Sequence, residues 1–79
     1  MPTLRGRLVD AETNMPLVGV GVFLDSYAAV TDREGRFAFS VPAGTYTLKI
    51  MFAFYKPYEE RINLYEDREI EIRLIRAFP

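Results

Sequence analysis

One short stretch carries the residue types that a metal or phosphate site would need. TDREG, residues 31–35, places Asp32 and Glu34 beside Gly35, and Asp25 lies a few positions upstream. A calcium ion takes about six to eight oxygen ligands, whereas this stretch offers few carboxylates and has arginines on both sides. A phosphate cradle needs a helix to begin after the glycine, and no helical spacing follows. Because a type I turn favours Asp at its first position and Gly at its fourth, the stretch predicts a turn, with neither a metal nor a cofactor.

Residues for catalysis are scarce. The chain has no histidine and no cysteine, so the commonest general base and the thiol nucleophile are both missing. The pairs Glu59/Glu60 and Glu69/Glu71 have the residue types of a glycoside hydrolase. On strands of alternating polarity, however, such charges usually form a solvated face or a strand edge. The sequence therefore predicts a protein that is not an enzyme.

Aromatic residues offer a candidate interaction surface. Tyr55, Tyr58 and Tyr65 fall in or beside one expected corner, and Met51 and Phe23 lie on outward phases of their strands. Tyrosine is enriched in protein interfaces and also stacks on sugar rings. Three interpretations stay open for these five residues: ordinary packing, contact with a protein, and contact with a glycan.

These residues must be positioned by β-strands. Apolar and polar residues alternate with period two, and turn residues recur about every 8–12 positions, which is typical of a sandwich or small barrel. We expect an all-β fold, a seven-stranded antiparallel Greek-key sandwich formed by one domain over residues 1–79. The expected strands are 3–9, 18–24, 28–31, 36–41, 45–55, 57–65 and 69–75.

The same alternation predicts which side chains face the core. It turns Val18 inward on the second strand, and Phe52 and Phe54 inward at the end of the long strand 45–55. Glu60 also falls on the inward phase, either as a charge that protects a strand edge or turned outward by a bulge.

Composition excludes several classes of partner. The net charge is −1, and the cationic residues are not clustered as nucleic-acid binding requires. No run approaches the roughly 18 apolar residues of a membrane span. The N-terminus as written has no apolar signal-peptide core, so we expect either a cytoplasmic protein or a module of a longer exported chain. The scarcity of amides and the eight arginines are weakly typical of a thermophile.

Two long segments carry a resemblance to a known family. GRLVDAETNMPLVGVGVFL and VTDREGRFAFSVPAGTYTLKI, followed by YKPYEERINL and IEIRL, resemble the carboxypeptidase regulatory-like domain family from about Gly6 to Leu74. The resemblance implies a prealbumin-like sandwich that serves as a non-catalytic accessory domain in cell-surface and exported proteins. From the residues themselves we expect a structural or protein-interaction module that contacts a partner protein or a second copy of the chain, through outward apolar residues or an exposed edge strand. The alternative is a carbohydrate-binding module that uses Tyr55, Tyr58 and Tyr65. A hydrolase of similar fold works through histidines, which this chain lacks.

The chain departs from the family pattern at two positions. Relatives usually carry glycine where this chain has Phe54, so a bulge there is in question and Phe54 is expected to extend the core. Relatives are usually apolar where this chain has Glu60.

Overall fold

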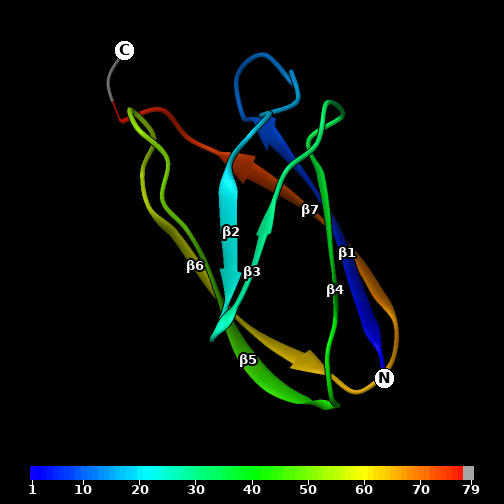
Figure 1. The fold of residues 1–79 in the computed structure, drawn as a ribbon. Helices are drawn as coiled ribbons and strands as arrows, with labels where there is room; N and C mark the ends of the chain where they lie inside the picture. The colour runs from blue at the N-terminus through cyan, green and yellow to red at the C-terminus, as the bar shows by residue number, and fades with distance from the viewer. Residues whose placement is uncertain (78–79) are drawn as a thin grey trace.

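Seven β-strands build the part of the protein that the structure describes. The computed structural model describes residues 1–77, and this part of the chain contains no helix. Three strands form one sheet in the order β4-β1-β7, and four form the other in the order β3-β2-β5-β6 (Figure 1). The strands are β1 (Thr3–Asp10), β2 (Gly21–Leu24), β3 (Tyr27–Val30), β4 (Arg36–Ser40), β5 (Gly44–Ile50), β6 (Tyr58–Leu64) and β7 (Arg68–Leu74).

The core lies between the two sheets. It is built from the alternate positions of the strands, because successive side chains of a strand point to opposite faces. β4, for example, buries Phe37 and Phe39 and exposes the residues on either side. The buried cluster contains Leu4, Leu8, Val20, Val22, Leu24, Phe37, Phe39, Val41, Leu48, Ile50, Ile62, Leu64, Ile72 and Leu74.

The predicted sandwich of seven strands is confirmed, but one pairing direction was wrong. β1 and β7 run parallel, with a register from Leu4↔Arg68 to Asp10↔Leu74, while the other ladders between the named strands are antiparallel. The turn after β6 carries the chain across to the other sheet, where it enters β7 in the direction of β1. The N–H of Thr3 donates to Oδ1 of Asp67 at 2.8 Å, which holds this turn beside the start of β1.

β3 and β5, which precede and follow β4 in sequence, both lie in the four-stranded sheet, whereas β4 lies in the three-stranded sheet. The chain crosses between the sheets at two corners. The first is the predicted turn: the N–H of Gly35 donates to the carbonyl of Asp32 at 2.9 Å. The carboxylate of Asp32 also accepts the N–H groups of Arg36 and Glu34, both at 2.9 Å, and these bonds lower its pKa. The second corner is the bend at Pro42–Ala43. Both corners therefore cross between sheets and neither closes a hairpin.

Three apolar residues predicted to face the core lie at the surface. Val18 is 52 % exposed because β2 begins only at Gly21, after Gly19 takes a positive φ of 72°. Phe52 is 36 % and Phe54 75 % exposed, because β5 ends at Ile50. The apolar alternation continues past the last paired residue, so it did not mark the end of the strand.

The side chain of Glu60 lies on the inward-facing side of β6, and no bulge turns it outward. It lies opposite Leu48 in an uninterrupted register, half-buried at the edge of the sheet. The hydroxyl of Tyr58 donates to its carboxylate. The charge is therefore satisfied within its own strand.

Thr31 is a buried polar residue that ties the segment before β2 to the sheet. Its hydroxyl donates to the carbonyl of Leu17 at 2.7 Å and accepts the N–H of Val20 at 2.9 Å. Its exposure is only 3 %. Both main-chain groups would lose a partner if the hydroxyl were removed.

Thr31→Val is therefore expected to destabilise the protein by about 2 kcal/mol, since buried groups left without a partner cost about 1–3 kcal/mol. Urea unfolding measures the effect. Thr31→Ser keeps the hydroxyl and serves as the matched control. Equal stability of the Val and Ser variants would contradict the role assigned to these two bonds.

Candidate functional site

Two segments far apart in sequence meet at one end of the sandwich. The loop between β5 and β6 lies beside the residues that follow β7 (Figure 1). The N–H of Lys56 donates to the carbonyl of Ile75, and the N–H of Ala77 donates to that of Phe54, both at 2.8 Å. We call residues 51–56 and 75–77 together the tip.

A buried carboxylate anchors the tip to the sandwich. Asp10 ends β1 and is only 2 % exposed. It accepts the hydroxyl of Tyr55 at 2.6 Å and Nε of Arg76 at 3.0 Å, one from each segment of the tip. It also accepts the main-chain N–H groups of Glu12 at 2.8 Å and Thr13 at 3.1 Å.

These bonds set the ionisation of the anchor. The hydroxyl of Tyr55, followed by the N–H of Glu12, holds the pKa of the Asp10 carboxyl well below its usual range. The bond to Asp10 in turn raises the pKa of Tyr55 and that of Arg76. A carboxylate that stays ionised and has its oxygens occupied is a poor proton carrier. Asp10 therefore acts as a structural anchor.

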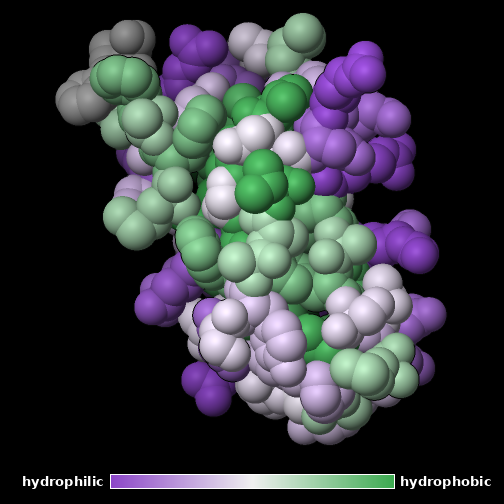
Figure 2. Space-filling model, in the orientation of Figure 1, coloured by the Kyte–Doolittle hydropathy of each residue, from purple (hydrophilic) through white to green (hydrophobic). Residues whose placement is uncertain are grey.

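The outer surface of the tip is apolar. Met51 is 74 % exposed, Phe54 75 % and Ile75 53 %. The ring of Phe52 stacks on that of Tyr55, with centroids 5.6 Å apart and planes 19° apart. Figure 2 shows apolar residues gathered over this end of the molecule, at the upper left of the view.

Phe54 adopts a backbone conformation that disfavours a large side chain. Its φ is +71°, in the left-handed region, which costs a residue with a Cβ roughly 1–2 kcal/mol. Asn14 and Asp25 also have positive φ, but their short polar side chains tolerate it. The position where the resembled family usually has glycine thus keeps a glycine-like conformation and carries a phenylalanine, which does not extend the core.

Phe54→Gly is expected to be more stable than Phe54→Ala by about 1 kcal/mol, because both lose the ring and only glycine relieves the left-handed backbone. Thermal and urea unfolding of the two variants measure the difference. Equal stabilities would contradict a strained backbone at this position.

The structure separates the residues of the predicted interaction surface. Met51 and Tyr55 lie in the tip, with Tyr55 half-buried over Asp10. Tyr58 begins β6, and burial together with its bond to Glu60 raises its pKa to about 12. Tyr65 is 67 % exposed beyond the other end of β6, roughly 20 Å away at the rise of a strand. Phe23, 48 % exposed, lies on the outer face of β2.

The three tyrosines therefore do not form one stacking surface. Sequence reasoning also missed Asp10, Ile75 and Arg76 as parts of a site. It placed Asp10 in a loop, Ile75 at the end of the last expected strand and Arg76 beyond that strand. No local pattern marks them, because their partners lie far away along the chain.

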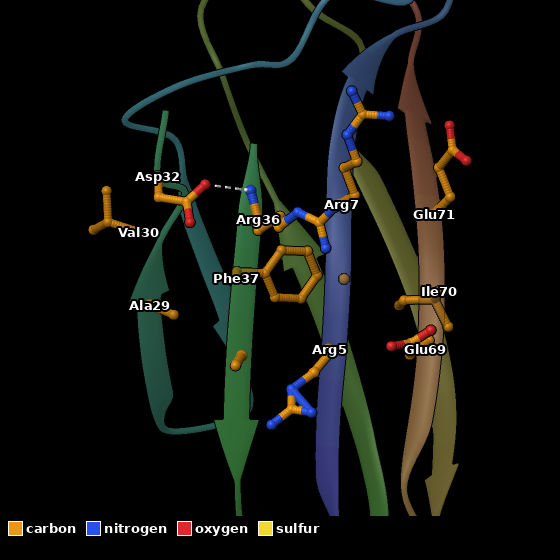
Figure 3. Close-up of a pocket in the computed structure, with 12 residues that line it drawn as sticks. Arg5, Arg7, Ala29, Val30, Asp32, Arg36, Phe37, Glu69, Ile70 and Glu71 are labelled. Carbon is orange, nitrogen blue, oxygen red and sulfur yellow. Dashed lines mark hydrogen bonds between the residues drawn. The ribbon is translucent and has the colours of Figure 1, made fainter. Parts of the chain in front are cut away.

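A shallow groove lies across the sheet β4-β1-β7. Its volume is about 700 Å³, and its walls carry arginines and glutamates (Figure 3). Arg5 lies opposite Glu69 and Arg7 opposite Glu71 on the neighbouring strands β1 and β7, so charges of both signs alternate there. Among residues 1–77 no three acidic, histidine or cysteine side chains are grouped to hold a metal ion. This described part also has no helix that is long and apolar enough to cross a membrane.

The fold is shared with solved structures. The chain is 22 % identical to 5-hydroxyisourate hydrolase from Klebsiella pneumoniae. The structural match covers 98 % of this chain and 92 % of the hydrolase chain, with a TM-score of 0.79. A streptococcal ancillary pilin is 18 % identical to this chain. That match covers 99 % of this chain and 30 % of the pilin chain, with a TM-score of 0.70. At these identities the likeness shows a common sandwich fold.

A closer sequence match comes from a protein complex. A chain of a type II cohesin–X-dockerin complex from Acetivibrio cellulolyticus is 30 % identical over 94 % of this chain, with a TM-score of 0.74. The chain spans 57 % of the length of that relative. A search of curated proteins gave no match. The sequence model of the CarboxypepD_reg-like domain matches residues 4–77, which is nearly the whole chain. The chain therefore belongs to the CarboxypepD_reg-like domain family.

Proposed function

We propose that this chain is one non-catalytic accessory module that contacts a partner protein through the apolar tip. The observation that carries the proposal is Phe54, whose large ring is exposed from a strained backbone conformation. Strain of this kind concentrates at functional positions. Glycine would fit the conformation at lower cost, and the ring contributes little to the core.

The surroundings of Phe54 suit a contact surface. Met51 and Ile75 enlarge the apolar area around the ring. The bonds between the two segments, together with Asp10, hold the tip in place. A surface that is already ordered loses less conformational entropy when it binds. The similarity to chains from a cohesin–dockerin complex and from a pilin is consistent with a module that contacts other proteins.

Photo-crosslinking tests the proposal. A photoreactive phenylalanine analogue replaces Phe54 in the cells that produce the protein, and crosslinked partners are identified by mass spectrometry. The same analogue at Tyr65, an exposed aromatic residue at the other end of β6, is the matched control. We expect one discrete protein adduct at position 54 and none at position 65. No adduct at position 54, or the same adducts at both positions, would refute the proposal.

A further inference from the structure

We propose that two copies of this chain associate through the free edge of β3, which extends the four-stranded sheet into one of eight strands. The edge of β3 is a different surface from the tip. The two sheets of the described residues have four edge strands, which are β4 and β7 in one sheet and β3 and β6 in the other.

β3 is the one described edge strand without a charged residue. Its sequence is YAAV, and its ladder with β2 is regular from Leu24↔Tyr27 to Gly21↔Val30. β4, β6 and β7 all carry arginine, and β6 and β7 carry glutamate as well. Charges, prolines and bulges are among the devices that prevent edge-to-edge pairing. β3, a strand of four residues, has none of these three.

The main-chain groups of Ala28 and Val30 point away from β2. A two-residue turn joins the strands, so Leu24 and Tyr27 form a hydrogen-bonded pair, and the bonding then alternates along the ladder. Thr31 confirms the phase: its N–H and carbonyl bond to Val20 and Gly19, on the side of β2. Within residues 1–77, neither Ala28 nor Val30 bonds to main chain outside the named strands.

A groove reaches this edge, which β4 of the other sheet approaches but does not pair with. The groove of Figure 3 runs from β7 across β1 and β4 and reaches Ala29 and Val30. Val30 is 66 % exposed, and Phe23 lies opposite Ala28 on the outer face with 48 % exposure. The surface over β2 and β3 in Figure 2 is mainly apolar. A strand that pairs here therefore gains apolar contacts as well as hydrogen bonds.

A second copy of β3 is self-complementary to this edge. With a two-fold axis at Ala29, Ala28 of each copy lies opposite Val30 of the other, and the pairing forms four main-chain hydrogen bonds. The small side chains of β3 permit close approach. The same arrangement brings Arg33, exposed in the turn after β3, towards the exposed Asp25 of the second copy. An antiparallel pair of β3 strands thus has residues of opposite charge at each of its ends.

Sedimentation of the purified chain tests the association. We expect a monomer–dimer equilibrium, which Val30→Pro weakens about tenfold or more because each copy loses one donor that the monomer does not use. Val30→Thr keeps the N–H and is the matched control, expected to associate like the original. Thermal unfolding checks that all three proteins are folded.

A disulfide tests the register. The chain contains no cysteine, and directly opposed residues outside the hydrogen-bonded pairs have Cα atoms about 4.5 Å apart, within the range of a disulfide. We expect Ala29→Cys to form a crosslinked dimer under mild oxidation much faster than Ala28→Cys. A monomer at every concentration up to about 1 mM, or faster crosslinking at position 28, would overturn the inference. Either result leaves the tip proposal standing, because the tip is tested separately.

Discussion

Replacing Asp10 by Asn is expected to lower the melting temperature at pH 7 by roughly 10 °C, a large change for a chain of this size. An amide cannot satisfy four donors, so at least some of the groups around Asp10, among them Tyr55 and Arg76, lose their acceptor. Both segments of the tip are then less firmly held. Thermal unfolding followed by circular dichroism measures the change.

The effect of this substitution depends on pH in a defined direction. The folded protein holds the pKa of Asp10 below its unfolded value, which is about 3.9. The stabilisation is therefore fully present above about pH 5 and is lost as the pH falls below about 4. We expect the original protein and Asp10→Asn to differ most at neutral pH and to converge towards pH 2. Glu12→Gln, at an exposed neighbouring position, is the control. A difference that stays constant from pH 7 to pH 2 would contradict the charged anchor.

Gly6→Ala is expected to destabilise the protein by about 2 kcal/mol, the usual cost of overpacking a core. A Cβ at Gly6 would lie 2.2 Å from Cζ of Phe37, whose ring covers the glycine from the neighbouring strand. The ring cannot move freely, because it is 5 % exposed and packs edge-on against Phe39 at 6.0 Å. Urea unfolding measures the loss.

Two further variants separate this contact from a general effect of alanine. Gly21→Ala is the control, since a Cβ there meets only the ring of Phe23 at 3.4 Å, and we expect little change. Phe37→Leu shortens the side chain above Gly6. In that background we expect Gly6→Ala to cost less than in the original protein. Equal costs in both backgrounds would show that the contact between Gly6 and Phe37 is not the cause.

Alternation predicted most of the core residues of the paired strands, although Val9 of β1 lies on the outward phase and is buried as well. β4 illustrates this, because Phe37 and Phe39 face inward as expected. The end of β5 could not be predicted in the same way. The apolar residues beyond Ile50 keep the pattern of a strand, and only the absence of a paired neighbour ends it. Pairing depends on distant parts of the chain.

The two corners on either side of β4 were also only partly predictable from the local sequence. Asp32 and Gly35 predicted a turn correctly, since turn chemistry is local. Whether the turn closes a hairpin or crosses to the other sheet depends on which strands pair, and the turn residues do not determine which strands pair. The tip was missed for a similar reason. Asp10 is separated in sequence from Tyr55 and Arg76, and only the finished sandwich brings the three together.

The parallel pairing of β1 with β7 affects how the module responds to tension. The start of β1 and the end of β7 lie at opposite ends of the pair. When the chain is pulled by its two ends, the first and last strands are drawn past each other in opposite directions. The bonds between them are then loaded together in shear, whereas a hairpin pulled open at one end loses its bonds one after another. The strands that receive the load are thus held to each other directly, which gives the chain a mechanical clamp between its ends.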